Sequence, residues 1–454
     1  MTPRLCFTNL PIEIGLLILH QLDSVRTLHC FISASSYHYR LFRENRLNIL
    51  AFVVPRSFHP SLLPLAVLVC EASDISLQFD IRQGEYDYKC PRTLPAKTAF
   101  SARKRKAVAK FLTKQWSEES LLASLHSKAI VLPLCRLYYV MDYFIMDYFE
   151  QTLALVQKHD RWGIFNSNQS ISDCEYARLQ RAFLHFELYR RLLGGLRKES
   201  WQGSEQARVK REHLYFLAYL ELHEMRELLA IYEYLQRRIE DLMDRTEDLL
   251  VEFVQNAPPG SPFPICTLDL QLPLYGTYSK DAQQAVVAFL NELGLPFQRL
   301  LFNAKDTKEF MQIAMLFENV PREPTLSTVI KENEFRERHL NSDSIVSIIH
   351  AKHGPGSELQ ISQCIDDDTQ TPSAELHQLR LSGCYFWDRG RIADIDRFQA
   401  DLVKSLPKER KRAMEIAAQA RLAGSNIKLE TLRDFIPLKL DSHEASKMIR
   451  ELEY

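Results

Sequence analysis

The feature that most constrains this fold is a long run of apolar residues, spaced three and four positions apart, between residues 212 and 255. Side chains at that spacing fall along one side of an α-helix, so the run predicts a helix. The rhythm is typical of a coiled-coil seam, but flanking apolar residues widen the stripe. A wide stripe favours packing inside a helical bundle of the same chain. The spaced residues are Met225, Leu228, Tyr232, Leu235, Ile239, Leu242, Leu249 and Phe253, and the flanking ones are Leu229, Ile231, Leu250 and Val254.

Helical periodicity also predicts most of the other elements. Two short stretches, residues 75–81 and 266–275, alternate apolar and polar residues as strands do, without a clear partner strand. The chain holds only 14 glycines in 454 residues, which suits helices better than a turn-rich β architecture. We therefore predict a mainly α fold with few or no β-strands. The further expected helices cover residues 11–22, 24–35, 37–50, 64–73, 104–126, 129–158, 173–194, 279–293, 305–318, 327–350 and 399–423.

Charge and cysteine content narrow the class of protein. The chain has 57 Lys and Arg against 58 Asp and Glu, so it exerts no overall electrostatic attraction on nucleic acid or anionic membranes. Two short basic runs, residues 103–106 and 408–412, resemble nuclear import signals but fit solvated helix faces better. The nine cysteines form no CxxC pair, so neither a disulfide framework nor a zinc knuckle is expected.

The cellular location follows from similar arguments. Glu13 and the charges after Arg40 interrupt the early apolar stretch, so no signal peptide is expected. The apolar segment 129–149 contains Arg136, Asp142 and Asp147, which are unfavourable in hydrocarbon, and we do not expect it to span a membrane. We predict a protein of the cytoplasm, the nucleus or both.

Motifs of catalysis are missing from the sequence. His350 and His353 share helical spacing but have no third ligand nearby, and the segment around His223 lacks the second histidine of a zinc-protease motif. No phosphate-binding loop and no Gly-x-Ser-x-Gly elbow occur. The sequence therefore predicts no catalytic residue, no cofactor and no metal ligand.

The first expected helix carries more apolar surface than one packing contact needs. Pro11 suits the first helical position, and Glu13 falls in the first turn, where a carboxylate suits the helix dipole. At about 100° per residue, the apolar side chains spread over an arc of roughly 200°, whereas one core contact takes little more than about 100°. Half of the arc is therefore free to contact something else. The arc consists of Ile12, Ile14, Leu16, Ile18, Leu19 and Leu22.

Two more expected helices follow directly, and three helices in about 45 residues lie near the lower size limit for independent folding. Such a segment either docks on the rest of its own chain or is completed by another protein.

The opening segment LPIEIGLLILHQLDSVRTLHCFISASS resembles an F-box. The F-box pattern is Leu-Pro, then x-Glu-Ile, Ile-Leu and Leu, with apolar positions in a second helix. In that family the three-helix unit binds a Skp-family adaptor, which docks on a cullin scaffold carrying the ubiquitin-transfer machinery. The tryptophan often found late in the motif is absent, and we expect Tyr39 or Phe42 to fill its space. The matching residues are Leu10-Pro11, Glu13-Ile14, Ile18-Leu19, Leu22 and Leu28.

The resemblance implies a non-catalytic F-box subunit of an SCF ubiquitin ligase. Such a subunit binds the Skp-family adaptor, through it a cullin, and recruits a protein target whose identity the sequence does not indicate. Neither nucleic acid nor membrane is an expected partner. The residues implied to form or support the adaptor-facing surface are Leu10, Pro11, Ile14, Ile18, Leu19, Leu22 and Leu28.

The implied domain order begins with the F-box at residues 1–50 and a helical body at 51–255. Clustered proline and glycine at residues 256–264 break the chain, and a C-terminal helical region follows at 265–454. Within that region, LSGCYFWDRGRI (381–392) resembles a Gly-x-x-Phe-Trp-Asp segment of many fungal F-box-like proteins. Phe386 and Trp387 fit a core better than a ligand platform.

Two other readings stay open. The chain could act with the adaptor outside degradation, or it could be a helical scaffold whose N-terminus packs on its own body. Target-binding surfaces were sought in the tyrosine-rich stretch 137–149 and the acidic stretch 366–368, which fit a packed core and a solvated loop better.

Overall fold

A computed structural model of the chain describes residues 10–72, 110–159, 170–193, 216–256, 287–304 and 383–388, apart from residues 115, 218, 288, 289, 292 and 384. In this part 82% of the residues are helical and none lies in a strand, which confirms the predicted mainly α fold. The helices expected at 305–318, 327–350 and 399–423 lie outside the described residues. So do the strands expected at 75–81 and 266–275.

The chain divides into two compact units. The first consists of Met1–Asp147 with Tyr176–Gly195, and the second of Tyr148–Glu175 with Leu196–Tyr454. Two long helices, α7 (Lys128–His159) and α8 (Asp173–Leu193), contribute residues to both units. Both helices agree with the predicted ranges 129–158 and 173–194.

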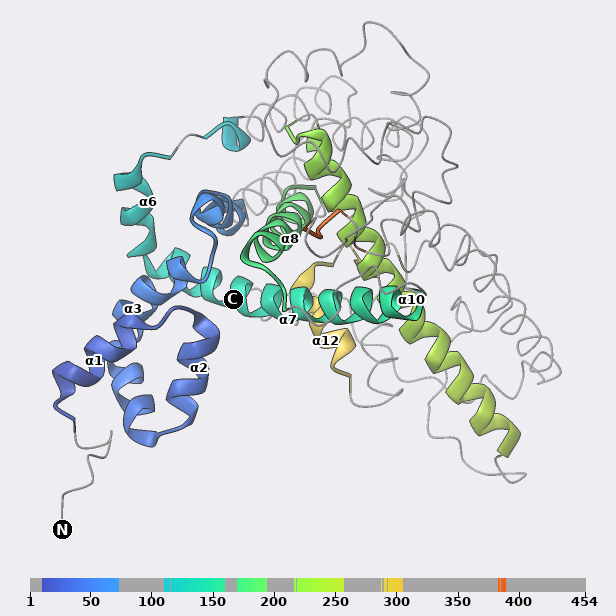
Figure 1. Cartoon of the computed structure of the whole chain (residues 1–454), viewed down its shortest axis with the longest axis horizontal. Coiled ribbons are helices and arrows are strands. Elements are labelled where there is room, and N and C mark those ends of the chain that lie inside the picture. The colour runs from blue at the N-terminus through green and yellow to red at the C-terminus, as the bar shows by residue number, and fades with distance from the viewer. Residues whose placement is uncertain are drawn as a thin grey trace, which may run out of the picture. The chain divides into compact units, whose positions relative to one another are not determined.

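The first unit begins with three helices that lie together in Figure 1: α1 (Ile12–Gln21), α2 (Val25–Ser33) and α3 (Ser36–Arg56). The third helix was expected to end at residue 50. It continues to Arg56 after a kink at Asn45, where φ is −118° and ψ is 23°. The implied boundary of the first domain at residue 50 therefore falls inside a helix.

A sharp corner follows α3. The 3₁₀ turn η2 (Pro60–Leu62) leads into a helix over residues 63–72, and the chain bends by 110° between α3 and this segment. The helix begins beside Pro64, as the sequence predicts, and its residues Ala66, Val67 and Val69 are fully buried.

One expected helix is two separate pieces. The range 104–126 was predicted as continuous, but residues 110–112 are helical and α6 (Glu118–Leu125) starts anew after a break. The Ser117 side chain accepts a hydrogen bond from the Ser120 N–H, 3.2 Å away, and so caps the N-terminus of α6. This serine is the sequence signal for the break.

The core of the first unit forms around the N-terminal part of α7. Phe58 packs against Tyr138 with ring centroids 5.6 Å apart, and Phe144 lies 6.2 Å from Phe183 of α8. Leu134, Met141, Phe144 and Ile145 are fully buried. The tyrosine-rich stretch 137–149 thus contributes mainly to the interior, as predicted.

The segment Lys128–Ala154 is long and apolar enough to cross a membrane, judged by length and composition alone. A buried core helix passes the same test, and 39% of its most apolar window is buried in this structure. Within this segment, the Asp142 carboxylate accepts a hydrogen bond from the Tyr176 hydroxyl at 2.6 Å. That the segment does not span a membrane stays a prediction.

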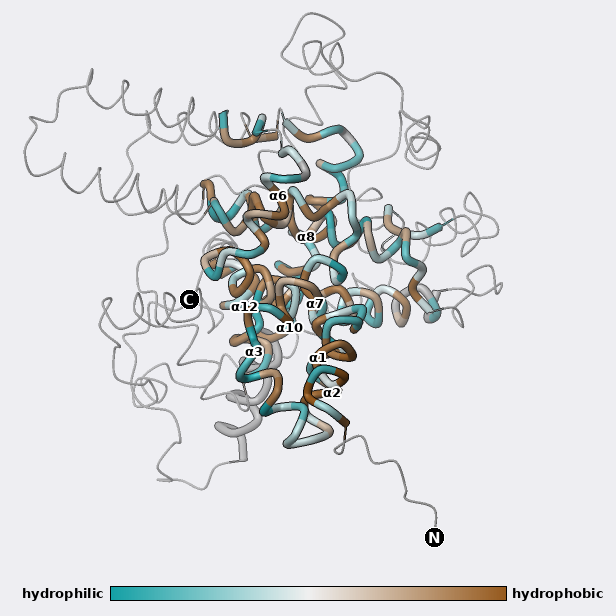
Figure 2. The backbone as a smooth tube through the Cα atoms, turned by 90° about the vertical axis from the view of Figure 1, so that its left-hand side faces the viewer, coloured by the Kyte–Doolittle hydropathy of each residue, from teal (hydrophilic) through white to brown (hydrophobic). Residues whose placement is uncertain are grey.

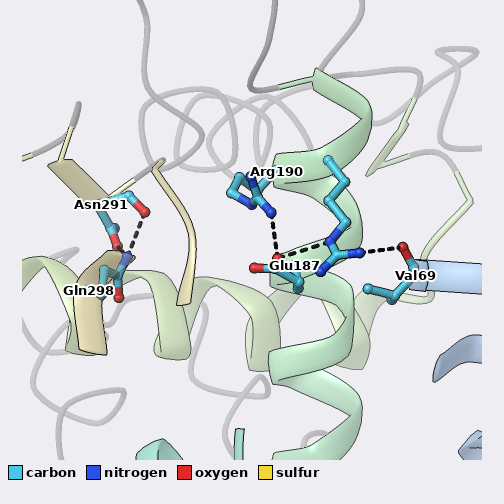
Figure 3. A network of polar contacts seen from close by, with 6 residues as sticks. Val69, Glu187, Arg190, Asn291 and Gln298 are labelled. Carbon is cyan, nitrogen blue, oxygen red and sulfur yellow. Dashed lines mark hydrogen bonds and ion pairs between the residues drawn. The ribbon is translucent and has the colours of Figure 1, made fainter. Parts of the chain in front are cut away.

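Two buried polar groups of α8 join it to other parts of the first unit. Gln180 donates to the Ser57 carbonyl at 2.9 Å and accepts from the His59 N–H at 3.0 Å. About two turns further on, Glu187 accepts from Arg190 at 2.6 Å and from Arg191 at 3.0 Å. Arg191 also donates to the Val69 carbonyl near the end of the 63–72 helix (Figure 3).

The second unit contains α10 (Leu222–Asn256) and α12 (Leu295–Phe302). The long helix starts at Leu222 rather than 212, because a turn at residues 219–220 precedes it and Glu224 accepts from the Glu221 N–H. Up to Ile239, both the spaced and the flanking residues are buried, and Leu242 is half-buried. In this half of the helix the wide apolar stripe packs as the bundle interpretation predicts, whereas the side chains of Leu249, Leu250, Phe253 and Val254 lie outside the described residues. The buried residues are Met225, Leu228, Leu229, Ile231, Tyr232, Leu235 and Ile239.

The helix α12 was not predicted. Gly294, with φ at 93°, precedes it, and the buried Gln298 donates to the Asn291 carbonyl at 2.6 Å (Figure 3). Asn291 in turn donates to the Tyr232 carbonyl of α10 at 3.0 Å. These amides place α12 against α10.

The Gly-x-x-Phe-Trp-Asp segment is part of the core of the second unit. Phe386 packs edge-on against Tyr148, and Trp387 against Phe149, with centroids 5.4 Å and 5.7 Å apart. Gly383 has φ at +72°, and a Cβ there would lie 2.9 Å from the Trp387 ring. The expectation that Phe386 and Trp387 are core residues is confirmed, since both are at most 1% exposed.

The aspartate of that segment joins the start of α8. Ser172 and Glu175 cap the helix reciprocally: the Ser172 N–H donates to the Glu175 carboxylate, and the Glu175 N–H donates to the Ser172 hydroxyl. The Ser172 hydroxyl also donates to Asp388, whose own N–H donates to Glu175 at 2.9 Å.

Candidate protein-binding surface

The first helix has a buried side and an exposed side. Gly15 and Leu19 are buried, whereas Ile14 is 42% exposed and Leu17 is 56% exposed. Ile12, at the N-terminus of the helix, is also 56% exposed. The apolar surface that the sequence predicts to be in excess of one packing contact is therefore present, and much of α1 is hydrophobic in Figure 2.

The buried side of α1 is fixed on α3 at both ends. The Tyr37 hydroxyl donates to the Leu10 carbonyl at 2.9 Å, and Arg56 donates to the His20 carbonyl at 2.6 Å. Between them, a Cβ on Gly15 would lie only 2.7 Å from Leu41. The two helices therefore run side by side in the same direction. Pro11 is the N-cap residue of α1 and precedes its first turn, one position earlier than expected.

The second helix packs on α3 in the opposite direction and also reaches α7. The Val25 N–H donates to the Ser57 hydroxyl at 2.9 Å, and the Phe31 ring lies 4.3 Å from His38. On its outer side, Arg26 approaches Asp142 at 4.0 Å. The N-terminal helices thus pack on the body of their own chain, while the outer face of α1 stays exposed.

The structure distributes the seven predicted adaptor-facing residues over three environments. Leu19 and Leu28 are 0% and 2% exposed, so in this structure they can support a surface but cannot contact a partner. Pro11 and Ile14 are exposed. The half-buried residues are Leu10, Ile18 and Leu22.

Three exposed apolar residues were missing from the predicted set: Ile12, Leu17 and Phe52. Phe52 is 47% exposed and its ring lies 4.8 Å from His20, which links α3 to the exposed side of α1. Leu17 lies outside the apolar arc drawn from the sequence. We call Ile12, Ile14, Leu17 and Phe52 the α1 surface.

His20 lies at the border of this surface. Burial and, to a smaller extent, the charge of Arg56 lower the pKa of His20. A lowered pKa favours the uncharged imidazole beside Phe52 near pH 7. Of the two residues expected in the place of the F-box tryptophan, Tyr39 is 53% exposed and Phe42 is half-buried.

The part of the chain that the structure describes offers little for metal binding or thiol chemistry. No group of three or more His, Cys, Asp or Glu side chains there could hold a metal ion. Burial raises the pKa of Cys70 to about 12 and that of Cys135 to about 11, so neither thiol is an activated nucleophile. His223 lies 3.1 Å from Glu221 on the surface, and the pair His350 and His353 lies outside the described residues.

Comparison with known proteins adds no relative: no protein-family model, curated protein or solved structure matches this chain. The F-box resemblance therefore stays a prediction from the opening 27 residues of the motif, Leu10 to Ser36.

Proposed function

We propose that this chain is a non-catalytic F-box subunit that binds a Skp-family adaptor through the α1 surface and recruits a protein target to a cullin-type ubiquitin ligase. One observation carries the proposal: Ile14 and Leu17 are exposed on a helix whose opposite side, at Gly15 and Leu19, is fixed against α3. The F-box landmarks occur in the expected order in the sequence, and for this reason we expect a Skp-family adaptor to bind that exposed face.

The exposed apolar residues of α1 supply part of the binding energy. Burying one fully exposed Leu or Ile side chain is worth about 1.5–3 kcal/mol. Ile12, Ile14 and Leu17 are already about half-buried, so covering the rest of all three gives about 2–5 kcal/mol. Association costs about 4–15 kcal/mol, so the half-buried Ile18 and Leu22 and polar contacts have to add to the apolar residues of α1.

The test is co-purification of the full chain with a Skp-family adaptor. Ile14→Asp combined with Leu17→Asp places two charges on the exposed face and should reduce adaptor capture at least about tenfold, equivalent to about 1.4 kcal/mol. The free energy of unfolding should change by no more than about 0.5 kcal/mol, because both side chains are solvent-exposed. Gln21→Ala, an exposed position of the same helix, is the matched control and should bind normally.

The choice of residues matters for this test. Leu19→Asp would bury a charge at a fully buried position and unfold the N-terminal helices, so loss of binding would mean nothing. Undiminished capture of the adaptor by the Ile14 and Leu17 double variant would refute the proposal, as would a wild-type chain that captures no adaptor.

A second candidate, the helical scaffold with a self-packed N-terminus, has its own support. Arg26 of α2 approaches Asp142 of α7, and His29 lies 6.0 Å from Tyr139, so α2 does pack on the body of the chain. The scaffold predicts that no adaptor binds. An F-box protein acting outside degradation predicts adaptor without cullin, and the leading proposal predicts both, with a target that accumulates when the gene is deleted.

A further inference from the structure

A group of arginines on α3 and α7 takes no part in the α1 surface. Arg40, Arg43 and Arg46 are spaced three residues apart along α3, and all three are exposed. Arg136, on α7, is exposed as well. We call these four residues the arginine patch. Spacing of three places Arg40 and Arg43 on adjoining parts of one helix surface, and Arg46 follows them after the kink at Asn45.

No counter-charge is paired with the patch within the described part of the chain. None of the four guanidinium groups forms an ion pair or a hydrogen bond with the residues that the structure describes. Glu44 lies one helical turn after Arg40 and between Arg43 and Arg46 in sequence. It is exposed and forms an ion pair with none of these three arginines in the described part of the chain. By contrast, Arg190 and Arg191 of the same unit are paired with Glu187.

The two helices bring their arginines to one place. Burial raises the pKa of the Cys135 thiol to about 11, and the positive charges of Arg46 and Arg136 both lower it against that larger effect. Arg136 directly follows Cys135 in α7, and Arg46 is the α3 arginine whose charge acts on the same thiol. Arg43 and Arg40 precede Arg46 in α3, on the other side of the kink at Asn45.

We propose that the arginine patch binds an acidic segment of a partner protein, with Asp and Glu carboxylates paired to the guanidinium groups. All four cations are arginines, whose planar guanidinium group forms paired hydrogen bonds with a carboxylate. Exposed Tyr39 (53%) and Tyr139 (42%) lie on the same two helices and offer apolar contacts beside the charges. That the patch recognises targets of a ubiquitin ligase rests on the proposed function. That it binds an acidic peptide does not.

A protein ligand fits better than nucleic acid. The chain carries a net charge of −1, and the four charges occupy a short surface rather than a long basic field. A short peptide with several carboxylates can neutralise such a surface, whereas a nucleic acid would extend beyond it over a neutral chain.

The experiment measures peptide binding to the full chain without any adaptor. The probe is a fluorescent library of 12-residue peptides with Asp and Glu at varied positions, and its counterpart carries Asn and Gln at the same positions. We expect retention of the acidic library alone, and a loss of at least about tenfold for Arg43→Ala combined with Arg46→Ala. The variant Arg43→Lys with Arg46→Lys should retain the acidic library less than the wild type and more than the alanine variant. It keeps the charges but loses the paired hydrogen bonds of the guanidinium groups.

Three results would overturn the proposal: equal retention of the acidic and neutral libraries, unchanged binding by the alanine variant, or tighter binding of a 12-nucleotide RNA than of the acidic library. A fourth measurement separates this surface from the α1 surface. The alanine variant should still capture the Skp-family adaptor, and loss of adaptor together with peptide would assign the arginines to adaptor binding instead. Failure of adaptor binding in the wild type would leave the peptide result standing.

Discussion

At the scale of single residues, Glu187 is a buried charge of the first unit that depends on its two partners. Its side chain is completely buried, and Arg190 and Arg191 both donate to its Oε1. Burial raises the pKa of Glu187, but the charges and hydrogen bonds of the two arginines outweigh burial and bring it to about 2. The carboxylate is therefore ionised at neutral pH, and it orients Arg191 toward the Val69 carbonyl.

Glu187→Gln should destabilise the chain by about 3–5 kcal/mol, because it leaves two arginines near the interior without their counter-charge. The measurement is the denaturant midpoint of the full chain. Asp173→Asn, an exposed acid in the first turn of the same helix, is the control and should lose no more than about 1 kcal/mol. A Glu187→Gln variant as stable as that control would contradict this account.

The same residue predicts a pH dependence. Its pKa falls from 4.5 to about 2 on folding, so the unfolded chain binds the proton more readily. The stability contributed by Glu187 is complete above about pH 4.5 and is lost as the pH falls toward 2, by at most about 1.4 kcal/mol per pH unit. Unfolding midpoints of the wild type should therefore fall more steeply over this window than those of Glu187→Gln, and equal slopes would be inconsistent with the ion pair.

At the scale of elements, α8 connects separate segments of the first unit through one amide. Gln180 bonds to both Ser57 and His59, more than 120 residues earlier in the chain, at the corner where α3 ends. The Ser57 hydroxyl accepts from Val25 and donates to the Val53 carbonyl, so the corner also anchors the start of α2. Loss of the amide should therefore also weaken the packing of the N-terminal helices.

Gln180→Met keeps the shape of the side chain but removes both hydrogen bonds, and should cost about 2–4 kcal/mol because the Ser57 carbonyl and the His59 N–H lose their partner. Chemical unfolding of the full chain measures this. Leu179→Met, a fully buried neighbour, is the matched control and should cost less than about 1.5 kcal/mol. Similar losses in both variants would mean that the amide contributes no more than packing.

Periodicity in the sequence was sufficient for the long elements. The ranges of α7 and α8 and the start of the 63–72 helix agree with prediction, because apolar spacing and the position of Pro64 determine them locally. The breaks before α6 and α10 were missed, although Ser117 and Glu224 are ordinary capping residues. The short helix α12 was missed because its stability comes from tertiary bonds of Asn291 and Gln298.

For the candidate site, the sequence indicated the helix but not its orientation. An arc of apolar residues shows that α1 has surface to spare, yet only packing decides which part faces inward. Gly15 permits close approach to Leu41, and this contact turns Leu19 inward and Leu17 outward. Phe52 belongs to another helix and follows the predicted end of α3, so no local pattern could have joined it to the surface.

At the scale of the whole molecule, the first unit is discontinuous in sequence. It needs residues 176–195 in addition to 1–147, and α3 runs past residue 50. A fragment ending at residue 50 lacks Arg56, which bonds to the His20 carbonyl, and Ser57, which bonds to Val25. The N-terminal helices therefore depend on residues outside the first 50.

Fragments test this dependence. The fragment 1–195 contains the complete first unit and should melt cooperatively, whereas fragments 1–147 and 1–50 should not, since each lacks part of it. Far-UV circular dichroism during heating measures the transitions. A fragment 1–50 that melts cooperatively at the same temperature as 1–195 would show that the opening helices are an independent domain.

The bond between Asp388 and Glu175 spans 213 residues and has a consequence for biosynthesis. A ribosome adds about 5–20 residues per second, so the segment carrying Tyr148 and Phe149 leaves the exit tunnel roughly 12–48 s before Trp387 arrives to pack on it. During that interval Tyr148 can pack on Tyr234 of α10, but Tyr148 and Phe149 still lack the rings of Phe386 and Trp387. A polypeptide that terminates upstream of residue 383 never completes this aromatic packing.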